Sequence, residues 1–202
     1  MALRLFGFLV LVVAGVGLLV AQPSCTRYSP AAQMAGTEEK EERKMEKAMF
    51  AAGCFWGVES IFQQIDGVVD TTVGYTGGTT DSPTYREVCS KDTGHAEAIE
   101  IVYDPAKVSY EKLLDIFWRA HDPTTLNRQG PDIGTQYRSV VFYYTPEQKA
   151  VAEKAMAEAQ KKWKKPIVTQ LVSGGVFYPA EAYHQDYFEK KGIKKSCHFL
   201  RD

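Results

Sequence analysis

Cys54 is the residue of this 202-residue chain best placed to carry out chemistry. It follows the apolar run KAMFAAG and precedes residues with helical spacing, so we expect it between a strand and the first turn of a helix. Unpaired backbone N–H groups and the helix dipole stabilise an anion at that place, which lowers the pKa of a thiol and favours a nucleophilic thiolate. The alternative is a small buried hydrophobic residue, which is what most cysteines are.

The elements that must position Cys54 alternate between strand and helix patterns. The sequence predicts strands over 45–53, 68–75, 95–103, 138–145 and 167–171, and helices over 54–65, 110–121, 146–163 and 180–190. Polar loops are expected over 77–85 and 124–136, where Gly, Pro and Asn accumulate. This order predicts a single α+β domain: a two-layer α/β sandwich with a mixed central sheet, in the form of a ferredoxin-like plait.

The N-terminal stretch is predicted to be an export signal or a membrane anchor over residues 1–21. Arg4 is its only charge, and residues 5–21 contain no polar side chain. Cleavage, a retained anchor and lipid modification of Cys25 all remain open. Residues 22–46 look like a solvated linker, residues 47–190 form the domain, and residues 191–202 are a basic tail. We therefore expect an exported, extracytoplasmic protein, which the N-terminus could tether to a membrane.

Composition excludes several classes of protein. The chain has 45% hydrophobic residues, enough for a real core, and a net charge of −1, which offers no basic surface for nucleic acid. No pair of its four cysteines has C-x-x-C spacing, and no two histidines lie three to five residues apart, so a zinc site is not expected. We expect no metal or organic cofactor. The cysteines could form two disulfides, remain idle thiols or carry out chemistry.

Several sequence blocks, beginning with Gly53-Cys54-Phe55-Trp56-Gly57, resemble the peptide methionine sulfoxide reductase A family. Further blocks follow in the family's order: GYTGG (74–78), YREVC (85–89), TGHAE (93–97), HDP (121–123), NRQG (127–130), GTQYRS (134–139) and AYHQ (182–185). Together they extend from Met49 to about Lys190. The resemblance implies reduction of methionine sulfoxide, free or in oxidised proteins, with specificity for the S epimer.

The resemblance also implies roles for individual residues. Cys54 would attack the sulfoxide sulfur, and Glu97 would be the general acid, kept protonated by a pocket of low dielectric constant. Three polar side chains would bind the sulfoxide oxygen or nearby waters: Tyr85, Tyr137 and Asp132. Each has a simpler reading. Glu97 could be the solvent-facing member of an alternating strand, the tyrosines could be packing residues, and the aspartate could be a turn former.

The same resemblance places Phe55 and Trp56 around the S-methyl group of the substrate. Methionine would then leave, with the nucleophile converted to a sulfenic acid. His95 and His184 could suggest a Cys–His hydrolase, but the family uses neither as a base, and we interpret both as structural. A cysteine acyl-transfer enzyme and a non-catalytic sulfoxide-binding module remain the alternatives.

A sulfenic acid must be resolved by a second thiol, and Cys197 in the tail is the candidate. A mobile tail can bring it onto Cys54, because closure entropy grows slowly with loop length. Electrons would then come from a thioredoxin-like dithiol protein. We interpret Cys89 as a buried structural thiol and assign no role to Cys25. The protein is expected to be a monomer.

Overall fold

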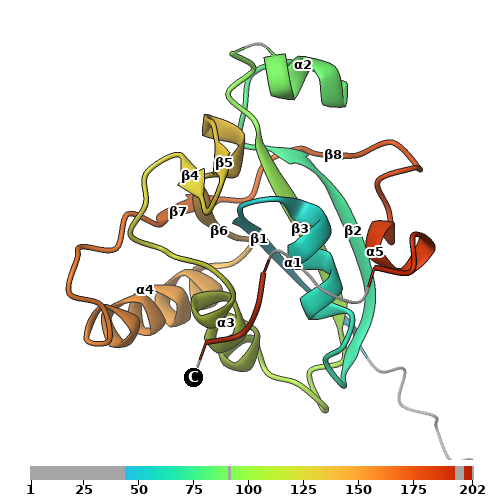
Figure 1. The fold of residues 1–202 in the computed structure, drawn as a ribbon. Coiled ribbons are helices and arrows are strands. Elements are labelled where there is room, and N and C mark those ends of the chain that lie inside the picture. Colours follow the sequence, from blue (N-terminus) through green and yellow to red (C-terminus); the bar gives the residue numbers. More distant parts are fainter. Residues whose placement is uncertain (1–43, 91, 194–197, 202) are drawn as a thin grey trace, which may run out of the picture. The chain divides into compact units, whose positions relative to one another are not determined.

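The computed structural model describes residues 44–90, 92–193 and 198–201 (Figure 1). The chain divides into two units, residues 1–40 and 41–202, and every described residue belongs to the second. The predicted export segment, most of the predicted linker, Cys25 and Cys197 lie outside the described residues. Within the described ranges, no helix is both long enough and apolar enough to span a bilayer.

A mixed six-stranded sheet forms the centre of the domain (Figure 1). Its strands are β1 (Glu46–Ala52), β2 (Val68–Thr76), β3 (Ala96–Tyr103), β6 (Ser139–Tyr143), β7 (Gln170–Ser173) and β8 (Phe177–Pro179), in the order β7-β6-β1-β3-β2-β8. The β6–β7 pair is parallel and the other four pairs are antiparallel. The predicted mixed α/β domain with a mixed central sheet is therefore confirmed in that general form.

The longer helices begin where the sequence supplies capping residues. The helices are α1 (Phe55–Phe62), α2 (Tyr85–Ser90), α3 (Tyr110–Ala120), α4 (Pro146–Gln160) and α5 (Tyr187–Lys190). The Ser109 hydroxyl accepts a hydrogen bond from the Lys112 N–H at the start of α3, and Thr145 caps α4 in the same way. Pro146 occupies the first turn of α4, where its missing N–H costs nothing.

The main core lies between one face of the sheet and three helices. Alternate residues of β1 point to opposite faces: Phe50 packs with the residues of α1, α3 and α4, whereas Met49 and Ala51 belong to a smaller cluster on the other face. The Phe50 ring lies 5.6 Å from that of Phe62 in α1 and 5.1 Å from that of Phe117 in α3. This packing holds α1 and α3 against β1.

Three predicted elements before residue 180 differ from the structure. The expected loop over 124–136 contains a small hairpin, β4 (Arg128–Gln129) with β5 (Asp132–Ile133), and a 3-10 turn, Thr135–Tyr137. The strand expected over 167–171 lies at 170–173, and a short strand, β8, follows it. The predicted loop over 77–85 is present up to its last residue, Tyr85, which begins the short helix α2 that was not predicted.

The helix predicted over 180–190 was wrong for most of its length. Only 187–190 is helical, because the preceding residues form turns and are bonded to strand β2. The Gln185 side chain accepts a hydrogen bond from the Val73 N–H and donates one to the Val73 carbonyl, each at 2.9 Å. Asp186 then takes a left-handed conformation, with φ of 53°, which breaks any helix running through it.

Candidate active site

Cys54 lies at the corner between β1 and α1, as predicted. It is the N-cap residue of α1, and its carbonyl accepts hydrogen bonds from the N–H groups of Gly57 (3.2 Å) and Val58 (3.3 Å). The residue is half-buried, and its thiol forms no disulfide. The corner therefore presents a cysteine to solvent at the N-terminal end of a helix, where the helix dipole favours an anion.

Gly53 is enclosed by two segments that are distant in the sequence. Its φ of 97° favours glycine, and a Cβ there would lie 2.6 Å from the Gln129 side chain and 3.1 Å from the His198 Nε2. Gln129 belongs to the β4–β5 hairpin, and its Oε1 accepts a hydrogen bond from the Asp122 N–H at 3.0 Å. The hairpin and the C-terminal segment thus both close against the residue before the cysteine.

Glu97 points its carboxylate at the first turn of α1. Its Oε2 accepts a hydrogen bond from the Phe55 N–H at 3.1 Å, and the residue is only 2% exposed. The simpler reading of Glu97 as a solvent-facing strand residue is therefore wrong. Since Phe55 directly follows Cys54, a buried carboxyl and a half-buried thiol share one helix N-terminus.

The two predicted tyrosines share one electrostatic environment with this carboxyl. Burial raises the pKa of Tyr137, and the charges of Glu97, Asp132 and Cys54 raise it further. Burial likewise raises the pKa of Tyr85, with further contributions from Glu97 and Tyr137. Both phenols are therefore protonated hydrogen-bond donors at neutral pH. The structure brings together all five polar or reactive residues that were predicted within the described ranges.

Phe55 and Trp56 project from the first turn of α1 into an aromatic cluster. Phe55 is 1% exposed and packs with Tyr75, whereas Trp56 is half-buried. The Trp56 ring stacks on Tyr187 in α5, with centroids 3.9 Å apart and ring planes 10° from parallel. An indole held face to face in this way forms a rigid apolar wall beside Cys54.

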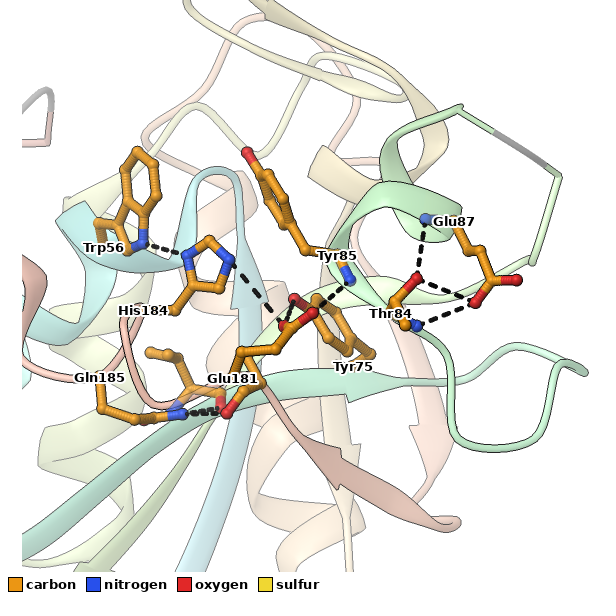
Figure 2. A network of polar contacts seen from close by, with 10 residues as sticks. Trp56, Tyr75, Thr84, Tyr85, Glu87, Glu181, His184 and Gln185 are labelled. Carbon is orange, nitrogen blue, oxygen red and sulfur yellow. Dashed lines mark hydrogen bonds and ion pairs between the residues drawn. The ribbon is translucent and has the colours of Figure 1, made fainter.

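The cluster depends on His184, which was interpreted as structural from the sequence, and on Glu181, which had no assigned role. Figure 2 shows the Trp56 Nε1 donating to the His184 Nδ1, at 3.0 Å, and Glu181 lying beyond the histidine ring. Burial lowers the pKa of His184, against an opposing effect of Glu181, so the ring is neutral. The AYHQ block marked this position, but residue types alone could not show its partner. His95 bonds the Thr80 carbonyl at 2.8 Å, as a structural histidine would.

The interpretation of Cys89 as a buried structural thiol was wrong. It is exposed, because α2 is a short surface helix whose only buried residue is Val88. Its thiol and the Tyr85 hydroxyl form a side-chain hydrogen bond. The thiol therefore lies at the edge of the site.

The C-terminal segment returns to the same corner. His198 is 5% exposed, and its Nε2 donates to the carbonyl of Ala52 at 2.8 Å. Three residues later, the Arg201 N–H donates to the Arg119 carbonyl at 3.0 Å, which fixes the segment to the end of α3. The residue after Cys197 thus lies against the strand end that leads to Cys54, although Cys197 itself is outside the described residues.

Comparison with known proteins identifies the family of enzymes to which this site belongs. The family model for peptide methionine sulfoxide reductase matches residues 46–202. The chain belongs to the peptide methionine sulfoxide reductase family. Peptide methionine sulfoxide reductase MsrA of Methanosarcina acetivorans is 60% identical to it over 151 residues, which cover 74% of this chain and 80% of the relative. The reductase is therefore an oxidoreductase that acts on methionine sulfoxide.

Solved structures agree with this assignment. The reduced form of Mxr1 from Saccharomyces cerevisiae is 40% identical, with a TM-score of 0.75 over 80% of this chain and 95% of that one. Mxr1 in complex with Trx2 is 27% identical, with a TM-score of 0.55 over 83% of this chain and 97% of that one. The described part of the reductase contains no group of three or more side chains that could hold a metal ion.

Proposed function

We propose that this reductase repairs oxidised proteins by reducing the S epimer of methionine sulfoxide, free or in polypeptides, through Cys54. The observation that carries the proposal is the 3.1 Å hydrogen bond from the Phe55 N–H to Glu97, which supports a carboxyl and a nucleophile at one helix start. In the first step the Cys54 sulfur attacks the sulfoxide sulfur and the oxygen is transferred. Thiol and sulfoxide become a sulfenic acid and a thioether, so atoms and electrons balance.

Glu97 would supply the proton that the oxygen needs as the sulfur–oxygen bond of the substrate breaks. Tyr85 and Tyr137 would donate hydrogen bonds to that oxygen, and Asp132 would order the water around it. The raised pKa values of both tyrosines support this role, because each hydroxyl keeps its proton. Phe55 and Trp56 would enclose the S-methyl group, a role supported by their place in the aromatic cluster.

A single-turnover assay tests the reductase step. The protein is mixed with one equivalent of N-acetylmethionine sulfoxide without added reductant, and the methionine derivative released is measured. We expect release by the wild type and none by Cys54→Ser. Equal release by both would exclude Cys54 as the nucleophile, and an acyl adduct in the mass spectrum would instead support a hydrolase.

We further propose that Cys197 resolves the sulfenic acid and that a thioredoxin-like protein reduces the resulting disulfide. The Cys197 thiol would displace water from the sulfenic acid, forming one disulfide and one water molecule. The packing of His198 against Ala52 supports this pairing, because consecutive Cα atoms lie only about 3.8 Å apart. The relative Mxr1, whose complex with Trx2 is known, supports a thioredoxin-like donor.

Peptide mass mapping after one turnover tests the disulfide. We expect a Cys54–Cys197 linkage in the wild type and in Cys89→Ser. A Cys54–Cys89 linkage would assign the resolving role to the exposed thiol in α2. In Cys197→Ser, turnover supported by thioredoxin should stop while turnover supported by dithiothreitol continues.

We also propose a ferredoxin-like core for the domain and an exported location for the protein. The order β6-β1-β3-β2, with antiparallel neighbours, and the packing of α1 and α3 on one face support a ferredoxin-like, two-layer core. The apolar run over residues 5–21 supports export and, where it is retained, a membrane anchor. N-terminal sequencing of membrane and soluble fractions tests export, and sedimentation tests the expected monomer.

A further inference from the structure

His184 lies almost fully buried in a cage of aromatic rings. It is 1% exposed, and its ring centroid is 4.2 Å from that of Tyr183, 4.3 Å from Tyr85 and 5.4 Å from Trp56. A packing role alone would be filled equally well by a phenylalanine. The polar atoms of the imidazole therefore need a separate explanation.

The hydrogen bonds of His184 assign its tautomer. An indole N–H can only donate, so the His184 Nδ1 accepts from the Trp56 Nε1 and carries no proton itself. In the neutral ring the proton therefore sits on Nε2. Within the described part of the chain, Nε2 has no hydrogen-bond partner, but the Glu181 Oε2 lies 4.0 Å away (Figure 2). The carboxylate thus faces the end of the ring that bears the proton.

Glu181 also holds the opposite side of the substrate site. Its Oε1 accepts from the Tyr85 N–H and its Oε2 from the Tyr75 hydroxyl, each at 3.0 Å. Burial would raise its pKa, but hydrogen bonds, with the Tyr85 N–H contributing most, lower it overall, so Glu181 is a carboxylate at neutral pH. One carboxylate therefore connects the start of α2, which carries Tyr85, with the histidine that holds Trp56.

We propose that Glu181 and His184 are positioning residues that set the width of the pocket for the S-alkyl group of the substrate. This rests on the proposed function, in which Trp56 encloses the methyl group and Tyr85 binds the sulfoxide oxygen. The Glu181–His184 pair fixes the Trp56 indole and anchors Tyr85 relative to it. The reductase thereby favours S-methyl over larger S-alkyl sulfoxides.

Two variants of equal shape isolate the hydrogen bond from the packing. His184→Asn keeps an acceptor oxygen near the position of Nδ1, whereas His184→Leu has almost the same shape and no acceptor. Both lose the ring equally, so a difference between them reports on the bond to Trp56. Methionine sulfoxide and its S-ethyl analogue are compared in single turnovers without reductant, over a range of concentrations.

We expect His184→Leu to raise the half-saturating concentration of the methyl substrate about tenfold relative to His184→Asn, because the half-buried Trp56 indole N–H loses its acceptor. The methyl-to-ethyl preference should fall by about the same factor, while the maximal rate changes less than about threefold. The Trp56 indole signal in ¹H–¹⁵N spectra, identified with Trp56→Phe, should move in the Leu variant and stay near its wild-type position in the Asn variant.

Equal behaviour of the Asn and Leu variants, or an unchanged methyl-to-ethyl preference in both, would overturn the proposal. Glu181→Gln should also lower the preference, whereas Glu87→Gln, whose carboxylate bonds Thr84 in the exposed turn before α2 (Figure 2), should not. An unchanged preference in Glu181→Gln would show that Glu181 is not a positioning residue. Failure of the proposed function looks different: Cys54→Ser would then still release methionine.

Discussion

The β1–α1 corner and the C-terminal segment meet at Gly53, yet they are held in very different ways. The corner is part of the core: Ala52 is 1% exposed, and Glu97 bonds the helix start from a central strand. The segment 198–201 is attached at its ends, through His198 to Ala52 and through Arg201 to α3. The difference suits two steps with different needs. Sulfoxide reduction requires groups fixed in advance, whereas resolution requires a thiol that can approach and withdraw.

The largest effect should come from a change at the β1–α1 corner, which is held rigidly by the core. Glu97→Gln keeps an acceptor for the Phe55 N–H but cannot supply the proton, so single-turnover release of methionine should fall by about 10²–10⁴-fold. Thermal unfolding should be close to that of the wild type. Glu100→Gln, on the same strand and facing the opposite side of the sheet, is the control. Wild-type release by Glu97→Gln would show that the proton comes from elsewhere.

An intermediate effect is expected from a change in the C-terminal segment 198–201. The Arg201 guanidinium donates to the His121 carbonyl and lies over the Trp163 ring, 5.4 Å from its centroid. Arg201→Ala should release this anchor and slow disulfide formation about tenfold, by lowering the effective concentration of the tail thiol. Methionine release should not change, and a sulfenic-acid trap such as dimedone should label more Cys54.

Arg86→Ala, in the exposed helix α2, is the matched control for the loss of an arginine. Equal slowing of methionine release and disulfide formation in Arg201→Ala would contradict this division. The corner and the C-terminal segment would then serve both steps together.

The smallest effect concerns helix α1 of the corner, where the contribution of Glu59 to folding stability depends on pH. Burial, followed by the charge of Asp186, raises the pKa of Glu59 in α1 from 4.5 to about 7. The folded state therefore binds more protons than the unfolded state between these values. The contribution of Glu59 to stability is complete below pH 4.5 and is lost as the pH rises through 7.

Glu59→Gln mimics the protonated side chain at every pH, and it can still accept from the Asp186 N–H. Its melting temperature should match that of the wild type near pH 4.5 and exceed it by roughly 2–4 °C at pH 8. The control Glu153→Gln, on the exposed face of α4, should show no such divergence. A constant difference between Glu59→Gln and the wild type across this range would contradict the shifted pKa.

The same contrast explains what could be predicted from the sequence. The β1–α1 corner was predicted because an apolar strand and a helical pattern are local signals, and the family blocks then named Glu97 and the tyrosines. The region over 180–186 was mispredicted because it is held by contacts with β2, such as the bonds of the Ala180 N–H and the Gln185 side chain to Val73. Local propensity cannot show such partners.

Individual residues show the same limit at the site. Alternation in β3 could not distinguish a buried Glu97 from an exposed one, because its partner is a backbone N–H in another element. The exposure of Cys89 depends on α2 lying at the surface, which residue types do not reveal. The partnership of His184 with Trp56 spans 128 positions and became visible only in three dimensions.

The enclosure of Gly53 has a consequence for transplanting this activity into another scaffold. A graft of the cysteine with its strand and helix would reproduce the corner, but Gly53 would be left uncovered. The hairpin side chain of Gln129 and the imidazole of His198 fill the space that any larger residue at position 53 would occupy. A working copy must therefore import three pieces of chain as a set, with a glycine where they converge.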